Sequence, residues 1–256
     1  MTEFHIVFHK DFIKRVDSTP AGNSETRITI PFNYLKEHSQ YKFVTPNPAP
    51  VPAILRAHTQ RHFDYITDLR LYEQARLAAG GAITSADLAY EQKPNFALIR
   101  PPGHHASRAS SWGFCYFNNM AISLLHLKSQ QKIKTAIVID FDLHVGDGNI
   151  DILGEDEDIH ILNPKDNTDT EFIQEIQDFL EERPEMDIIC ASAGFDQYER
   201  DWGGNISTQG YKKIGEVMKA YAQKHCQGRR YALFEGGYYE KDLGKNIFAF
   251  CEGFKD

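Results

Sequence analysis

The stretch that decides the fold is IVIDFDLHVGDG, residues Ile137 to Gly148. Its apolar first part has the continuous hydrophobicity of a strand buried on both faces of a parallel sheet, and three carboxylates and a histidine follow. In open α/β sheets, ligands bind beyond the carboxyl ends of the strands. The pattern therefore predicts a parallel sheet and a functional site at the end of this strand.

Three acids and a histidine at two strand ends are candidate metal ligands. Asp142 and His144 are two residues apart, so their side chains leave an extended chain on the same face, and Asp140 is in phase with them. A second apolar run, residues 188–195, ends in the same way at Asp196. Two aspartates and one histidine with an open position for water are typical of a catalytic zinc site. For any one of these acids alone, a turn or a helix N-cap is the ordinary alternative.

A histidine pair follows a rigid corner in RPPGHHA, residues 100–106. The two prolines fix the backbone and the glycine permits a turn, so His104 and His105 are presented at a set position. Histidine titrates near physiological pH, which suits it to proton transfer. Two surface histidines in a proline-rich turn remain the alternative.

A third apolar run, residues 231–234, leads into Glu235-Gly236-Gly237-Tyr238-Tyr239. The glycine pair would let a tyrosine turn back over the edge of the sheet. A phenol there can donate a hydrogen bond to a developing oxyanion. An aromatic lid on a tight turn is the alternative reading.

In this order along the chain, the segments resemble the histone deacetylase family, within the arginase/deacetylase fold and related to acetylpolyamine amidohydrolases. The matching segments are RPPGHHA (100–106), GFCYFNN (113–119), residues 140–148, AGFD (193–196) with Asp201, and EGGY (235–238). The resemblance implies a short, prokaryotic-type member. It also implies an α/β fold in which residues 1–256 form a single three-layer catalytic domain, with a mostly parallel central sheet and helices on both faces.

The resemblance implies roles in metal binding and proton transfer. The zinc ligands would be Asp142, His144 and Asp196. Iron(II) is an alternative ion, and a structural potassium ion is expected at the main chain near residues 140–144. The proton-transfer group implied consists of His104 and His105 with their carboxylate partners Asp140 and Asp147. In that group His105 is the better general base and acid, and His104 acts mainly through its charge.

The resemblance also implies a substrate site. Tyr238 would polarise the carbonyl group of the substrate. Phe114 matches one aromatic wall of an acyl-lysine tunnel, with Cys115 beside it at the floor. The glycines expected to border the substrate are Gly113, Gly236 and Gly237.

Two departures from the family concern substrate choice. The chain between Asn149 and Asp187 is short, and neither a glycine-rich substrate loop nor a second aromatic tunnel wall can be located in it. Trp202 replaces the usual proline, and Gly203 occupies the position at which polyamine-selective members carry a glutamate. These departures predict a wide, shallow mouth and weaken a polyamine assignment, although Glu199 or Asp201 could reach the rim.

Composition bounds the function classes. The chain has 256 residues, of which 41% are hydrophobic, and a formal net charge of −8, which disfavours nucleic-acid binding. No apolar stretch approaches the roughly 20 residues of a membrane span, and the first 12 residues lack the pattern of a secretory leader. The cytoplasm is the expected location. The cysteines are scattered without a C-x-x-C pair and are expected to be reduced thiols: Cys115, Cys190, Cys226 and Cys251.

Alternating apolar patterns predict strands and helices in turn, which indicates a parallel sheet covered on both faces. The expected strands are residues 4–8, 96–99, 135–139 and 159–162, in addition to the runs at 188–195 and 231–234. The expected helices are residues 59–77, 84–91 (with Thr84 as N-cap), 118–129, 170–182, 207–224 and 241–254. Residues 43–52 are expected to be a proline-rich connector. The histidines without motif context are expected to be structural or exposed: His58, His62, His126, His160 and His225.

The favoured function is therefore a zinc-dependent deacylase acting on an acylated amine, such as the side chain of acetyl-lysine or a small acetylated amine. An acetylpolyamine amidohydrolase is the nearest alternative. A ureohydrolase with two manganese ions and a non-catalytic binder of acylated ligands are further alternatives. The tandem histidines and the tyrosine after Gly236-Gly237 argue against the ureohydrolase.

Overall fold

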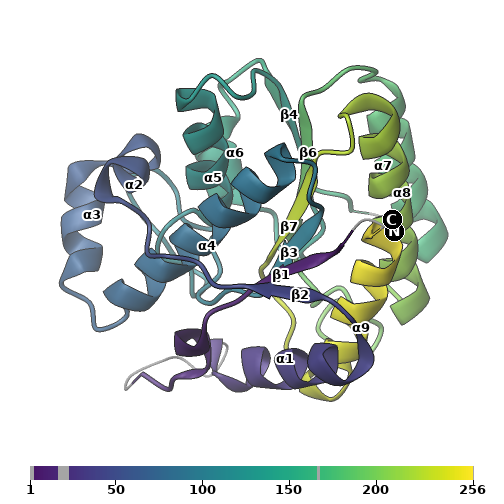
Figure 1. The fold of residues 1–256 in the computed structure, drawn as a ribbon, viewed down its shortest axis with the longest axis horizontal. Helices are drawn as coiled ribbons and strands as arrows, with labels where there is room; N and C mark the ends of the chain where they lie inside the picture. The colour runs from purple at the N-terminus through teal and green to yellow at the C-terminus, as the bar shows by residue number, and fades with distance from the viewer. Residues whose placement is uncertain (1–2, 17–22, 166–167, 256) are drawn as a thin grey trace.

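The structure is a computed structural model that describes residues 3–16, 23–165 and 168–255. Within these residues, seven parallel strands form one sheet in the order β2-β1-β3-β7-β6-β4-β5 (Figure 1). This architecture confirms the predicted α/β fold. The strands are β1 (His5–Val7), β2 (Lys42–Val44), β3 (Asn95–Ala97), β4 (Ala136–Asp140), β5 (Ile159–Leu162), β6 (Ile188–Ala193) and β7 (Arg230–Phe234).

Helices cover both faces of the sheet, with α2 to α6 on one side and α1, α7, α8 and α9 on the other (Figure 1). Their bounds are α1 (Thr26–His38), α2 (Val51–Ala57), α3 (Gln60–Thr67), α4 (Tyr72–Tyr90), α5 (Asn119–Ser129), α6 (Asp147–Leu153), α7 (Asp169–Glu181), α8 (Thr208–His225) and α9 (Glu240–Phe254), with a short 3-10 helix at Lys10–Ile13. Because β4 and β6 are covered on both sides, every residue in them is buried. This explains their unbroken apolar sequences.

The order of the strands places a crevice between β4 and β6. From β4 the chain continues outward to β5, whereas from β6 it continues in the opposite direction to β7. Adjacent parallel strands whose connections diverge form a switch point, where open α/β sheets bind ligands. The strands are in register up to Asp140 opposite Ser192, so both chains leave the sheet at the same level.

Two phenylalanines orient the residues that follow these strands. Phe141 and Phe195 are buried and pack edge to face, with ring centroids 5.9 Å apart. In an extended chain, neighbouring side chains point in opposite directions. Because the rings point into the core, Asp142 and Asp196 point away from it, into the crevice.

One predicted helix boundary is wrong. In place of the predicted helices 59–77 and 84–91, the structure has α3, which ends at Thr67, and α4, which runs without a break through Gly80-Gly81. A Cβ at Gly80 would lie 1.9 Å from the carbonyl oxygen of Asn47, and one at Gly81 would lie 2.7 Å from Ile99. The glycines therefore allow close packing and do not end the helix. Thr84 is not an N-cap; its hydroxyl donates to the carbonyl of Gly80 over 2.9 Å.

Other boundaries also differ from those expected. The break lies at residues 68–71, between α3 and α4, where the hydroxyl of Thr67 donates to the carbonyl of Asp64 and so competes with the helix. Residues 43–52, expected to be a connector, contain the end of β2 and the start of α2. The sequence patterns predicted neither α1 nor α6.

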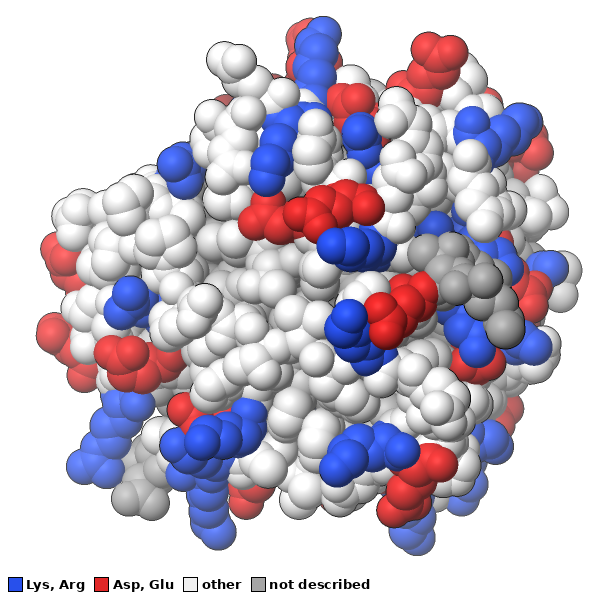
Figure 2. Space-filling model, viewed as in Figure 1, with Lys and Arg blue, Asp and Glu red and all other residues white. Residues whose placement is uncertain are grey.

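Charge is distributed over the surface seen in Figure 2. Lysine and arginine side chains alternate there with aspartate and glutamate, so on this face the net charge of −8 is not gathered into one field. None of the helices in the described part of the chain combines the length and the apolar character needed to span a lipid bilayer.

Candidate active site

Asp142, His144 and Asp196 meet in the crevice between β4 and β6. Each offers one ligand atom, and these atoms all lie within 4.8 Å of one another. Nδ1 of His144 is 3.2 Å from Oδ1 of Asp142 and 3.2 Å from Oδ2 of Asp196. The structure thus brings together the three residues that the sequence singled out as metal ligands.

The chemistry of this group fits a divalent cation. The main chain donates to both oxygens of Asp142, from His144 to Oδ1 over 3.0 Å and from Gly236 to Oδ2 over 2.8 Å, and to one oxygen of Asp196, from Leu143 to Oδ1 over 2.9 Å. Oδ2 of Asp196 is buried and accepts no well-aligned hydrogen bond, although Nδ1 of His144 lies 3.2 Å away. Burial raises the pKa of Asp196 to about 7, and the carboxylates of Asp142 and Asp196 raise the pKa of His144 to about 10. A divalent cation would displace these protons and supply the charge that the buried carboxylates need.

Gly236 lets the main chain pass between the two aspartates. A Cβ at this position would lie 2.4 Å from Oδ2 of Asp142 and 2.8 Å from Oδ2 of Asp196. No side chain fits there unless the carboxylates move. This close approach accounts for the first glycine of the pair.

The histidine pair lies beside the three ligands, and each imidazole has a carboxylate behind it. His104 Nδ1 is 3.3 Å from Asp140 Oδ2, and His105 Nδ1 is 2.6 Å from Asp147 Oδ1. Burial opposes a charge on His104, but the carboxylates of Asp142 and Asp140 outweigh it and hold the pKa of His104 well above its usual value. Burial, together with the charge on His104, lowers the pKa of His105 to about 4. His105 is therefore neutral at pH 7 and able to accept a proton.

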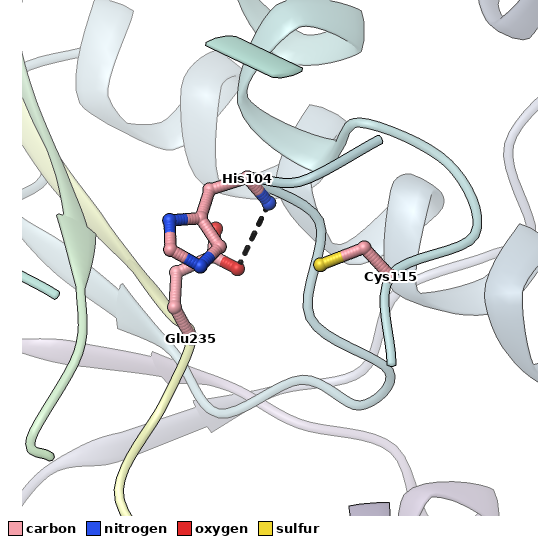
Figure 3. Close-up of side chains that lie close together, drawn as sticks. All are labelled: His104, Cys115 and Glu235. Carbon is pink, nitrogen blue, oxygen red and sulfur yellow. Dashed lines mark hydrogen bonds between the residues drawn. The ribbon is translucent and has the colours of Figure 1, made fainter. Parts of the chain in front are cut away.

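A second group of potential ligands consists of His104 itself with Cys115 and Glu235, whose side chains lie close together (Figure 3). Burial raises the pKa of the Cys115 thiol well above its usual value and that of Glu235 to about 7. Glu235 Oε2 accepts from the main chain of Gly103 over 2.7 Å and of His104 over 3.2 Å, and the Cys115 sulfur accepts from that of His105 over 3.4 Å. These contacts indicate that Cys115 and Glu235 hold the backbone of the histidine pair.

A pocket of about 200 Å³ is lined by both members of the histidine pair and by His144 of the metal-ligand set. Four aromatic side chains form much of its wall; the full lining is Pro102, His104, His105, Trp112, Gly113, Phe114, His144, Trp202, Gly236 and Tyr238. Of the expected substrate-binding residues, Gly113, Phe114 and Gly236 line the pocket. The structure places Cys115 and Gly237 outside the lining: Cys115 faces the backbone of the histidine pair, and the open side of Gly237 faces Leu243 and Phe195.

Tyr238 lines the pocket. Its ring stacks on Trp202, with centroids 4.0 Å apart, and the guanidinium of Arg27 lies 4.7 Å from its centre. Arg27 Nε also donates to the carbonyl of Gly237 over 2.7 Å, which fixes the turn that carries the tyrosine. Burial raises the pKa of Tyr238, so the phenol is a hydrogen-bond donor at neutral pH.

The sequence did not locate the second aromatic wall, which Trp112 and Trp202 supply. Trp202 takes the rim position expected for Gly203, whereas Gly203 packs against the main chain: a Cβ there would lie 2.8 Å from Cα of Gln197. Both tryptophans are more than half exposed. The sequence did contain one signal for this wall: Trp112 directly precedes the GFCYFNN segment (113–119). The histidines without motif context, namely His58, His62, His126, His160 and His225, lie outside the pocket lining, as expected.

A model of the histone deacetylase domain matches residues 4–172 and 161–254. The chain belongs to the histone deacetylase family. Members of this family are hydrolytic deacetylases. The two matched segments overlap at residues 161–172, within the short stretch between Asn149 and Asp187.

Several relatives of this family member are informative. A probable deacetylase of Archaeoglobus fulgidus is 29% identical, over a match that covers 91% of the chain and 80% of that protein. The polyamine deacetylase HDAC10 of Danio rerio is 36% identical over 96 residues, covering 37% of the chain and 14% of that protein. The crystal structure of the HDA15 HD domain has a TM-score of 0.86 at 20% identity, covering 100% of the chain and 91% of that structure. This last similarity supports the fold.

Proposed function

We propose that the protein is a zinc-dependent deacylase that hydrolyses the amide of an N-acylated amine, such as acetyl-lysine or a small acetylated amine. One observation carries the proposal: Asp142, His144 and Asp196 form a metal-ligand set, and its His144 lines a pocket together with the neutral His105 and Tyr238. These are the groups that metal-assisted amide hydrolysis requires.

Each side chain has a role in the proposed reaction. An ion held by the three ligands would act as a Lewis acid on the acyl carbonyl and on water. Asp147 holds one nitrogen of His105, so the other can take a proton from water and deliver it to the leaving amine. His104, held by Asp140, stays charged beside it. Tyr238 donates to the carbonyl oxygen as negative charge develops there.

The proposed function includes the metal ions that the enzyme binds and its location in the cell. Zinc is the favoured ion, iron(II) is an alternative, and a potassium ion near residues 140–144 belongs to the same hypothesis. We infer that residues 1–256 act as one catalytic domain in the cytoplasm and need neither nucleic acid nor a membrane. The four cysteines are free and buried, as reduced thiols would be.

An acylated polyamine is the second candidate substrate, because relatives include polyamine deacetylases. The lining of the pocket contains no carboxylate among the described residues that would pair with a distal ammonium. Asp201 is engaged, since its Oδ2 accepts from the main chain of Tyr238 and Tyr239. We therefore favour a substrate whose acyl-amine stem is held by aromatic contacts.

The proposal is tested by assaying metal-free protein reloaded with zinc, iron(II), cobalt or manganese against acetyl-lysine peptides, acetylpolyamines and longer acyl-lysines. Turnover with zinc is expected, and Asp196→Ala should lose both turnover and bound zinc. Asp64→Ala removes an exposed carboxylate of α3 and serves as the matched control.

Two results would contradict the proposal. Two manganese ions per chain and release of urea from a guanidine would indicate the ureohydrolase. Thermal stabilisation by acylated ligands without turnover, at full zinc occupancy, would indicate the binder.

A further inference from the structure

Trp112 contacts both members of the His105–Asp147 pair. Its indole Nε1 donates to Oδ2 of Asp147 over 2.8 Å, while Oδ1 of the same carboxylate lies 2.6 Å from Nδ1 of His105. The indole also lies against the imidazole, with ring centroids 3.8 Å apart and planes at 30°. The carboxylate is therefore held on both oxygens, by the imidazole on one side and the indole on the other.

A tight turn brings Trp112 back over the histidine. Ala106 and Ser111 form an antiparallel bridge, and the main chain of Cys115 donates to the carbonyl of Trp112 over 2.9 Å. The residue after the tryptophan is Gly113, which has a φ of +59°, and a Cβ there would lie 2.5 Å from Cδ2 of His105. Only glycine both adopts this backbone conformation readily and fits this close to the imidazole.

The two histidines differ in how their carboxylate partners are held. The side chain of Asp140 is fully buried, and Asn149 donates to it over 3.0 Å. The side chain of Asp147 is 49% exposed, so water can compete with His105 for its oxygens. A second fixed donor removes part of that competition. Trp112 supplies this donor, and its ring covers the imidazole from the solvent side.

We propose that Trp112 is a positioning residue for proton transfer: by fixing Asp147 and covering the ring of His105, it keeps the free nitrogen of that imidazole aimed into the pocket. This inference rests on the proposed function, in which His105 is the general base and acid. Trp112 would then act on the rate of the chemical step, in addition to forming a wall of the pocket.

The kinetic test uses Trp112→Phe, which keeps an aromatic ring but removes the N–H donor. On an acetyl-lysine peptide, kcat should fall roughly 10-fold while KM and zinc content change by less than about 2-fold. On the matching trifluoroacetyl-lysine peptide, whose carbonyl is more electrophilic and needs less help from a base, the loss should be smaller. Tyr65→Phe removes one donor from another exposed aromatic side chain, outside the pocket lining, and is the matched control.

A spectroscopic test does not depend on turnover. The chain contains two tryptophans, so protein labelled with 15N-tryptophan has two indole N–H resonances, which Trp112→Phe assigns. In Asp147→Asn, the Trp112 resonance should move upfield because an amide oxygen is a weaker acceptor than a carboxylate. The Trp202 resonance should stay in place, and Asp64→Asn should move neither.

The outcomes separate this inference from the proposed function. If the wild-type enzyme turns over substrate, three results would overturn the role of Trp112 and leave the deacylase standing. They are a normal kcat in Trp112→Phe, an equal loss of kcat on both substrates, and an unmoved indole resonance in Asp147→Asn. Absence of turnover by the wild-type protein with every metal and substrate would overturn the proposed function, and the role of Trp112 with it.

Discussion

Gly236→Ala should separate the metal ligands from one another without removing any of them. The added methyl group would lie 2.4 Å from Oδ2 of Asp142 and 2.8 Å from Oδ2 of Asp196, whereas ordinary contact begins at about 3.4 Å. The Asp142 oxygen must therefore retreat by about 1 Å, and metal sites tolerate departures of only about 0.2 Å in ligand distance.

This displacement of the ligands sets the expected loss of zinc affinity. Changes to groups that only orient metal ligands cost about 10- to 100-fold in affinity, so moving two ligands should cost at least about 100-fold, or about 2.7 kcal/mol. The methyl group also overpacks the site, which should lower the free energy of unfolding by about 1–3 kcal/mol. The fold should survive this smaller effect.

Zinc affinity is measured by competition with a chromogenic chelator, and folding by circular dichroism and urea denaturation. Gly228→Ala is the control for an added methyl group, because no atom lies within 4 Å of the new Cβ; Gly228, unlike Gly236, has a positive φ, of +80°. It should cost about 1 kcal/mol of backbone strain and leave zinc binding unchanged. Wild-type zinc affinity in folded Gly236→Ala would refute the assignment of Asp142 and Asp196 as joint ligands.

Three further outcomes are expected. Tyr238→Phe should lower kcat roughly 100-fold or more at unchanged zinc content, and a near-normal rate would remove the phenol from the oxyanion site. Because the pKa of His144 is raised to about 10 and that of Asp196 to about 7, zinc must displace one proton above pH 7 and a second below it. Zinc affinity should therefore fall with falling pH, by roughly tenfold per unit above pH 7 and more steeply below, in chelator titrations from pH 6 to 8; a flat profile would contradict this. Burial lowers the pKa of His58 to about 3, so the unfolded chain takes up the proton first and the free energy of unfolding should fall as pH falls from about 6.5 to about 3. In His58→Gln, urea denaturation should show a shallower pH dependence over this range, and an unchanged slope would exclude this histidine as its source.

Much of the site could be predicted because parallel strands deliver their carboxyl ends to one edge. The apolar runs before Asp142 and Asp196 identify two such strands, and residue spacing then places Asp142 and His144 on one face. That reasoning needs only the alternation of an extended chain. It brought together three ligand candidates from two segments separated by more than 50 residues.

The bounds of α4 and the position of Trp112 depend on contacts between residues distant in the sequence, which a local sequence pattern does not encode. The predicted helices 59–77 and 84–91 leave Gly80-Gly81 between them, but α4 runs through both glycines, which pack closely against Asn47 and Ile99. Trp112 reaches His105 only through the turn at Gly113, whose backbone angle is not readable from the residue types around it. Both failures are cases in which tertiary packing decided the role of a glycine.

The placement of both tryptophans at one pocket has an optical consequence. Tryptophan emission in most proteins averages over several environments, but here the whole signal arises from two indoles at the mouth of the candidate active site. The unlabelled protein thus carries its own reporter, and the arrival of a ligand in the pocket should be visible as a change in intrinsic fluorescence.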